Sequence, residues 1–136
     1  GYRYYQTQGK RARFCFGHGL SYTTFSYEEV QVSREKEIEV SLKVKNTGSR
    51  KGKELIQLYI HPVDNGADRP VQELKGYEKI ELDCGEEKNV TFTLSEESFA
   101  RYDGERKAFV TEPGRYEIWL GESCEKILAK AEVRIG

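Results

Sequence analysis

The sequence contains no methionine, one tryptophan and three cysteines among its 136 residues. No stretch approaches about 18 consecutive apolar residues, which argues against a membrane-spanning helix. Charge of one sign is also missing, because 22 basic and 23 acidic side chains leave a formal net charge of −1. Nucleic-acid-binding proteins usually carry a basic excess, so this balance argues against that class. Since the chain starts at Gly1 and lacks methionine, we expect it to be a fragment of a longer protein.

The cysteines Cys15, Cys84 and Cys124 are far apart in the sequence. An odd number without close spacing is not a disulfide framework, although one pair could form and leave one thiol over. We expect reduced, inert cysteines, which weakly favours a cytoplasmic over a secreted protein. Cys15 and His18 have a chelating spacing, but two candidate ligands are too few for a structural zinc site. The sequence therefore predicts neither a metal nor a cofactor.

What the sequence does contain is a series of strand patterns after residue 23. Apolar residues from Ile38 to Val44 alternate with polar ones, as expected for a half-buried strand. Residues 55–60 are apolar on both faces, which indicates a central strand. Further strand patterns cover residues 74–82, 90–94, 107–111, 116–120 and 127–135.

The segments between these strands carry turn signals and little helical pattern. Asn46-Thr47-Gly48 and Cys84-Gly85 predict turns, and residues 62–70 predict a surface loop. Residues 95–102 have room for a single helical turn. Strands without covering helices pack as two sheets, so we expect an all-β, immunoglobulin-like or fibronectin type III-like sandwich of seven to eight strands over residues 24–136.

Residues 1–23 do not follow the strand pattern. Residues 1–25 hold four basic side chains and none of the 23 acidic ones, and they are rich in tyrosine and phenylalanine. So many aromatic side chains should pack against something, either the side of the sandwich or a preceding domain. We therefore expect a linker or docking segment. Its expected contact residues are Tyr2, Arg3, Tyr4, Tyr5, Phe14, Phe16 and His18.

Motifs of catalysis are missing from the chain. Gly17 to Ser21 is not the nucleophile elbow of a serine hydrolase, and the pair Gly17 and Gly19 lacks the rest of a dinucleotide-binding loop. The Glu-Glu pairs, such as 86–87, are neighbours in sequence and face apart on a strand, so they do not form the carboxylate pair of a glycosidase. No catalytic residue is predicted.

The aromatic residues Tyr59, Tyr77 and Trp119 lie within or beside predicted strands. Strand aromatics mostly pack in the core or across strands, and this is the reading we favour. The alternative is that these three side chains form a platform on which sugar rings stack.

Several motifs occur in an order that resembles a known family. Gly1 to Tyr5, the FCFGHGLSYTTF string of residues 14–25, and residues 45–48, 52–60, 69–79 and 112–117 together resemble the end of bacterial glycoside hydrolase family 3 enzymes, which include β-glucosidases and β-xylosidases. The resemblance covers nearly the whole chain. It implies a fibronectin type III-like C-terminal domain, with the catalytic residues in preceding domains that this chain does not contain.

The resemblance implies a non-catalytic structural and docking module of an enzyme that removes terminal β-linked sugars. The chain alone would then not be an enzyme, and its partners would be the preceding catalytic domains of the same polypeptide. Alternatives are a module that binds carbohydrate weakly or positions substrate, or one that forms a homodimer. Neither nucleic acid nor a membrane is expected as a partner. Sugar and linkage specificity are not readable from these residues.

Overall fold

The computed structural model describes residues 23–63 and 73–136, and these contain nine β-strands and one short 3-10 helix, η2. In chain order they are β1 (Phe25–Ser33), β2 (Ile38–Asn46), β3 (Gly52–Pro62), β4 (Glu73–Leu82), β5 (Glu87–Leu94), η2 (Glu96–Phe99), β6 (Arg101–Asp103), β7 (Ala108–Val110), β8 (Gly114–Ser123) and β9 (Lys126–Ile135).

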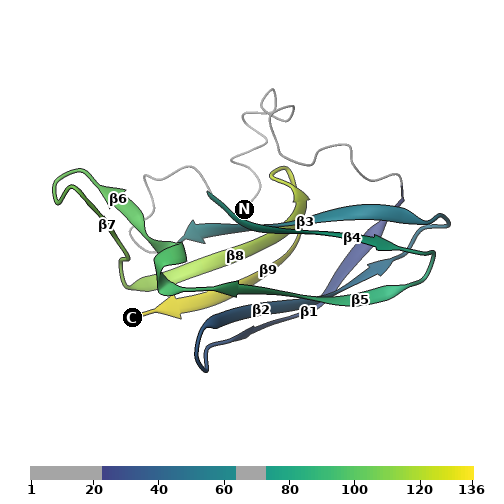
Figure 1. The fold of residues 1–136 in the computed structure, drawn as a ribbon, viewed down its shortest axis with the longest axis horizontal. Coiled ribbons are helices and arrows are strands. Elements are labelled where there is room, and N and C mark those ends of the chain that lie inside the picture. The colour runs from purple at the N-terminus through teal and green to yellow at the C-terminus, as the bar shows by residue number, and fades with distance from the viewer. Residues whose placement is uncertain (1–22, 64–72) are drawn as a thin grey trace.

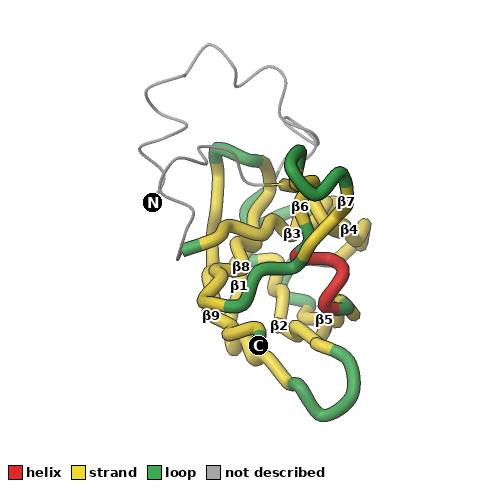
Figure 2. The backbone as a smooth tube through the Cα atoms, turned by 90° about the vertical axis from the view of Figure 1, so that its left-hand side faces the viewer, coloured by secondary structure: helices red, strands yellow, loops and turns green. Residues whose placement is uncertain are grey.

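Two sheets face each other and form a sandwich (Figure 1). One sheet has the strand order β1-β2-β5 and the other β4-β3-β8-β9, and the neighbouring strands are antiparallel. Strands β6 and β7 form a separate hairpin that projects from one end of the sandwich (Figure 1), and Figure 2 is turned so that this end faces the viewer. The predicted all-β sandwich is confirmed.

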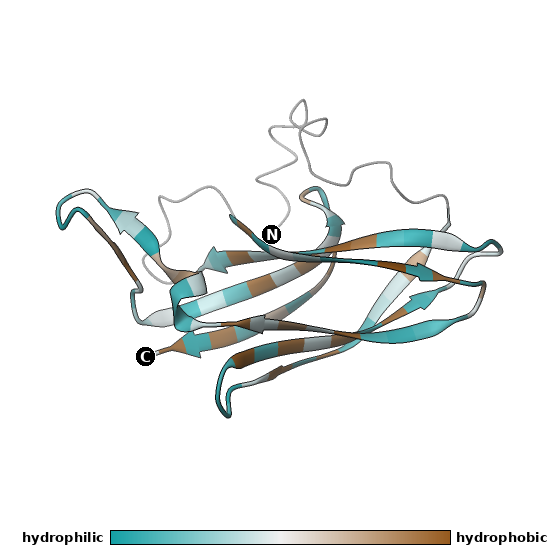
Figure 3. Ribbon diagram, in the orientation of Figure 1, coloured by the Kyte–Doolittle hydropathy of each residue, from teal (hydrophilic) through white to brown (hydrophobic). Residues whose placement is uncertain are grey.

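The alternating pattern of β2 explains its place between β1 and β5. Ile38, Val40, Leu42 and Val44 are buried, whereas the intervening residues face the other side of the sheet. Figure 3 shows the corresponding alternation of brown and teal along the ribbon. Strand β3 is buried without interruption over residues 54–60, as predicted for a strand with both faces covered.

The core lies between the inner faces of the sheets. Each fully buried aliphatic side chain contributes about 1.5–3 kcal/mol through removal of its surface from water. The largest of the most deeply buried apolar side chains, on β2 of one sheet and on β3, β4 and β8 of the other, are Leu42, Val40, Val44, Ile56, Leu58, Leu82, Ile118 and Leu120.

Strands β1 and β4, each at one edge of a sheet, carry features that disfavour further pairing. Strand β1 contains a bulge between Glu28 and Gln31, where Glu29 adopts a φ of 54°. Glu29 also forms a 2.7 Å ion pair with Lys43 of β2. Strand β4, an edge of the other sheet, exposes charged side chains along most of its length.

Most sequence predictions of local structure agree with the observed strands and turns. Each predicted strand is present, usually a few residues longer than its pattern, and the helical turn predicted within residues 95–102 is η2. Strands β1 and β6 were not predicted. The loop predicted over 62–70 lies mainly outside the described residues, and β3 continues to Pro62.

Candidate functional site

The residues predicted for docking lie outside the described part of the chain. These are Tyr2, Arg3, Tyr4, Tyr5, Phe14, Phe16 and His18, and the same holds for Cys15. Within residues 23–63 and 73–136, no group of three or more His, Cys, Asp or Glu side chains could hold a metal ion. No helix in this described part is long and apolar enough to cross a membrane.

The backbone just before β1 is held by Asn46 at the end of β2. This side chain is fully buried, and its amide nitrogen donates to the carbonyl oxygens of Arg50 at 2.7 Å and Leu82 at 3.0 Å. Its Oδ1 accepts hydrogen bonds from the Thr23 hydroxyl at 3.1 Å and the Gly48 amide at 2.9 Å. One side chain thus joins the start of β1, the turn after β2 and the end of β4.

The same turn touches the start of β1 closely. The Thr47 amide donates to the Thr24 carbonyl at 2.8 Å, and the two threonine hydroxyls lie 2.9 Å apart. A Cβ atom at Gly48 would lie 1.8 Å from Oγ1 of Thr23, so this approach requires glycine. We name Thr23, Thr24, Asn46, Thr47 and Gly48 the junction clamp. It fixes the backbone at Thr23 and Thr24, immediately before β1.

The outer face of the four-stranded sheet carries a second apolar cluster. Tyr59, Trp119 and Ile127, on β3, β8 and β9, are only 5%, 2% and 7% exposed. The Tyr59 hydroxyl donates to Gln57, and burial raises the pKa of Tyr59 to about 12. The favoured reading of Tyr59 and Trp119 as packing residues is confirmed, and as buried side chains they cannot form an exposed sugar platform. Tyr77 is 59% exposed.

Charged and polar side chains surround Trp119. Its indole nitrogen donates to Glu117 at 2.8 Å, and the ammonium group of Lys130 lies 4.2 Å from the ring centroid. The ring of His61 is 5.2 Å from that of Trp119, and burial lowers the pKa of His61. Nδ1 of His61 is buried without a hydrogen-bond partner in the described part of the molecule. This face is therefore a packed polar and aromatic surface.

A pair of carboxyl groups lies inside one end of the sandwich, and the sequence analysis missed it. Glu54 on β3 is 1% exposed and accepts a 2.8 Å hydrogen bond from Tyr27 of the opposite sheet. Burial, and then a hydrogen bond with Glu122 on β8, raise the pKa of Glu54. Glu122 in turn forms a 2.9 Å ion pair with Lys126. Because Glu54 is buried, the pair is suited to structure rather than to hydrolysis.

The cysteines differ from the expectation that all three are reduced. Cys124 is disulfide-bonded, whereas Cys84 is an exposed free thiol. The error arose because spacing along the chain says little about which residues meet in space. The preference for a cytoplasmic location rested on reduced cysteines and loses that support.

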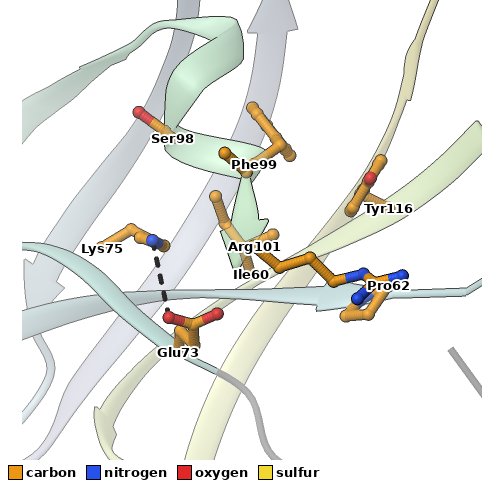
Figure 4. Close-up of a pocket in the computed structure, with 9 residues that line it drawn as sticks. Ile60, Pro62, Glu73, Lys75, Ser98, Phe99, Arg101 and Tyr116 are labelled. Atoms are coloured by element: carbon orange, nitrogen blue, oxygen red, sulfur yellow. Dashed lines mark ion pairs between the residues drawn. The ribbon is translucent and has the colours of Figure 1, made fainter. Parts of the chain in front are cut away.

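A cleft lies where the start of β4, η2 and the β6–β7 hairpin meet. Its narrow inner part is floored by Ile60, Phe99 and Tyr116, and Figure 4 shows Glu73, Lys75 and Arg101 at its rim. Its outer part has a volume of about 520 Å³ and lies against the exposed rings of Tyr102 and Phe109. No sequence motif indicated this site, because its residues come from segments far apart in the chain.

Comparison with known proteins gives a consistent result. Residues 54–124 match the family model of the fibronectin type III-like domain. The chain is 46% identical over 140 residues to thermostable β-glucosidase B of Acetivibrio thermocellus. This match covers 99% of the chain and 18% of that protein. It is 42% identical over 132 residues to β-glucosidase BoGH3A of Bacteroides ovatus, and that match covers 93% of the chain and 18% of the protein.

Solved structures show the same relationship. The GH3 β-glucosidase of Bifidobacterium adolescentis superposes with a TM-score of 0.82 at 36% identity, over 99% of this chain and 20% of that one. The chain therefore spans about a fifth of the length of the relatives it matches.

Proposed function

The chain belongs to the fibronectin type III-like domain family and matches a small part of glycoside hydrolase family 3 β-glucosidases, so we propose that it is the non-catalytic structural and docking module of such an enzyme. The parent enzyme would remove terminal β-linked sugars. Its catalytic groups would lie in the remaining four-fifths of the polypeptide, which are the module's partner.

The observation that carries this proposal is the nearly complete coverage of the chain by a small part of much longer relatives. The junction clamp supports it, because it holds the entering chain at Thr23 and Thr24 through several hydrogen bonds. A firmly held entry point would keep the module at a constant orientation to whatever precedes it. Residues 1–23, with their aromatic and basic side chains, are proposed as the segment that contacts the catalytic domains.

The proposal can be tested in the β-glucosidase of Acetivibrio thermocellus. Three forms are compared: the intact enzyme, a truncation that lacks the part matching this chain, and a chimera in which this chain replaces that part. We expect the truncation to lose thermal stability and turnover of an aryl β-glucoside, and the chimera to regain much of both. A truncation as stable and as active as the intact enzyme would contradict the docking role.

The isolated chain serves as the control for catalysis. It should show no turnover of the aryl β-glucoside above background, and measurable turnover would overturn the non-catalytic assignment. Light scattering of the same sample tests the alternative of a dimerisation module, which predicts twice the mass of 15.7 kDa.

A further inference from the structure

Tyr102 and Phe109 are the most exposed aromatic side chains of the β6–β7 hairpin, at 55% and 73% exposure. Their rings meet edge to face with centroids 5.4 Å apart. The hairpin stands apart from both sheets, so neither ring contributes to the core between them. Two exposed aromatic rings in contact offer an apolar surface of the kind that can bind a ligand.

The hairpin is rigidly built at its turn. Oδ1 of Asp103 accepts hydrogen bonds from the amides of Glu105 at 2.9 Å and Arg106 at 3.3 Å. At its base, the Thr111 hydroxyl donates to the Glu96 carbonyl at 3.0 Å. These hydrogen bonds hold the hairpin backbone beside the cleft, which lowers the entropy cost of ordering it on binding.

The polar lining of the cleft is balanced in charge. Glu73 and Lys75 lie 3.6 Å apart, and Glu97 and Arg101 complete the set of two acidic and two basic side chains. Such a lining gains little from an ionic ligand. It suits a neutral ligand that carries many groups able to both donate and accept hydrogen bonds, as sugar hydroxyls do.

Arg101 is fixed in a way that suits recognition. Its Nε and one terminal nitrogen both lie 2.7 Å from Oε1 of Glu112. These two contacts hold the guanidinium plane in place and use two of its five N–H donors. The cleft volume of about 520 Å³ falls within the range of small-molecule sites, roughly 300–1,000 Å³.

We propose that this cleft binds a neutral pyranoside of one or two sugar rings, with an apolar sugar face stacked on Phe109, the more exposed ring, and hydroxyls bonded to Arg101 and Lys75. This site differs from the platform of Tyr59, Tyr77 and Trp119 considered from the sequence. It goes beyond the docking function and does not depend on it, because a module can hold sugar whether or not it also holds its parent enzyme together.

The test is a titration of the isotope-labelled chain with methyl β-glucoside and with cellobiose, followed by amide chemical shifts. We expect saturable shifts at Lys75, Arg101, Tyr102 and Phe109 with a millimolar Kd. Phe109→Ala should weaken binding at least about tenfold. Since Phe109 is 73% exposed, this variant should remain folded, and its dispersed spectrum verifies that.

Two controls separate stacking from nonspecific effects. Sorbitol offers similar hydroxyls without a ring and should cause no saturable shift, and Tyr77→Ala, outside the cleft, should bind as the parent chain does. No saturable shift at roughly 50 mM sugar would overturn the proposal, because millimolar affinities are detectable there. Equal shifts in Phe109→Ala would also overturn it. The proposal would also be overturned if Phe109→Ala destabilised the chimera while sugar left the spectrum of the isolated chain unchanged. The hairpin would then be a contact with another domain.

Discussion

The phenol of Tyr27 on β1 donates a hydrogen bond of 2.8 Å to the carboxyl group of Glu54 on β3, which joins the two sheets through their interior. Both residues are buried, Tyr27 at 8% and Glu54 at 1% exposure. A polar contact in this position matters for stability because neither group can turn to water if the other is lost.

We expect Tyr27→Phe to lower the free energy of unfolding by about 1–3 kcal/mol, the cost of leaving a buried polar group without its partner. The measurement is urea denaturation of both chains. Tyr102→Phe removes a hydroxyl from an exposed ring and should change stability by less than about 0.5 kcal/mol. Equal effects of the two substitutions would show that the Tyr27 hydroxyl is not a stabilising contact.

The pH dependence of stability should carry the signature of Glu54. Burial raises the pKa of this carboxyl from 4.5 to about 9, so between these values the folded chain keeps a proton that the unfolded chain has released. Raising the pH through this window therefore lowers stability, by at most about 1.4 kcal/mol per pH unit for one group. The glutamine of Glu54→Gln cannot titrate. The unfolding free energy of this variant should therefore increase relative to that of the parent chain as the pH rises from 5 to 9.

That comparison uses the difference between the two chains, because other groups titrate equally in both. A constant difference across the window would mean that Glu54 is ionised in the folded chain. The buried environment deduced from the structure would then be wrong for this residue.

Removal of the Asn46 side chain should disrupt the junction clamp. Asn46→Ala leaves the Arg50 and Leu82 carbonyls and the Gly48 amide without this partner. We expect a loss of about 2–4 kcal/mol, typical of breaking a buried hydrogen-bond network. Asn89→Ala, at an exposed position of β5, is the matched control and should stay within about 0.5 kcal/mol of the parent chain.

The close approach of Thr23 to the turn predicts a specific pair of substitutions. Gly48→Ala places a Cβ atom 1.8 Å from Oγ1 of Thr23 and should cost about 1–3 kcal/mol. Thr23→Ala removes that oxygen, so the double variant should be more stable than the sum of the single effects predicts. A Cβ at Gly104 meets nothing within 4 Å, and Gly104→Ala should be neutral. If the two single changes in unfolding free energy simply added up in the double variant, Thr23 would not lie against Gly48.

Local sequence patterns were sufficient for most of the fold. The alternation from Ile38 to Val44 and the continuous apolar run of residues 55–60 correspond to a half-buried strand and an inner strand of the larger sheet. Strand β1 was missed because its bulge at Glu29 interrupts the alternation, and β6 was missed because three residues are too few for a pattern.

The candidate sites were harder to predict because they depend on which strands meet. Glu54 and Glu122 lie far apart in the sequence, and only the pairing order β3-β8 brings them together. The cleft likewise joins Glu73 of β4 to Phe109 of β7. The spacing of residues within one strand carries no information on such encounters, whereas it does report which face a side chain takes.

The bulge at Glu29 and the charged face of β4 also bear on solubility. Strands β1 and β4 each lie at one edge of a sheet, where free backbone groups could pair with a strand from another molecule. The bulge in β1 and the exposed charged side chains of β4 make pairing with such a strand unfavourable. These two edges of the module are therefore protected against pairing with strands of neighbouring molecules when the protein is concentrated.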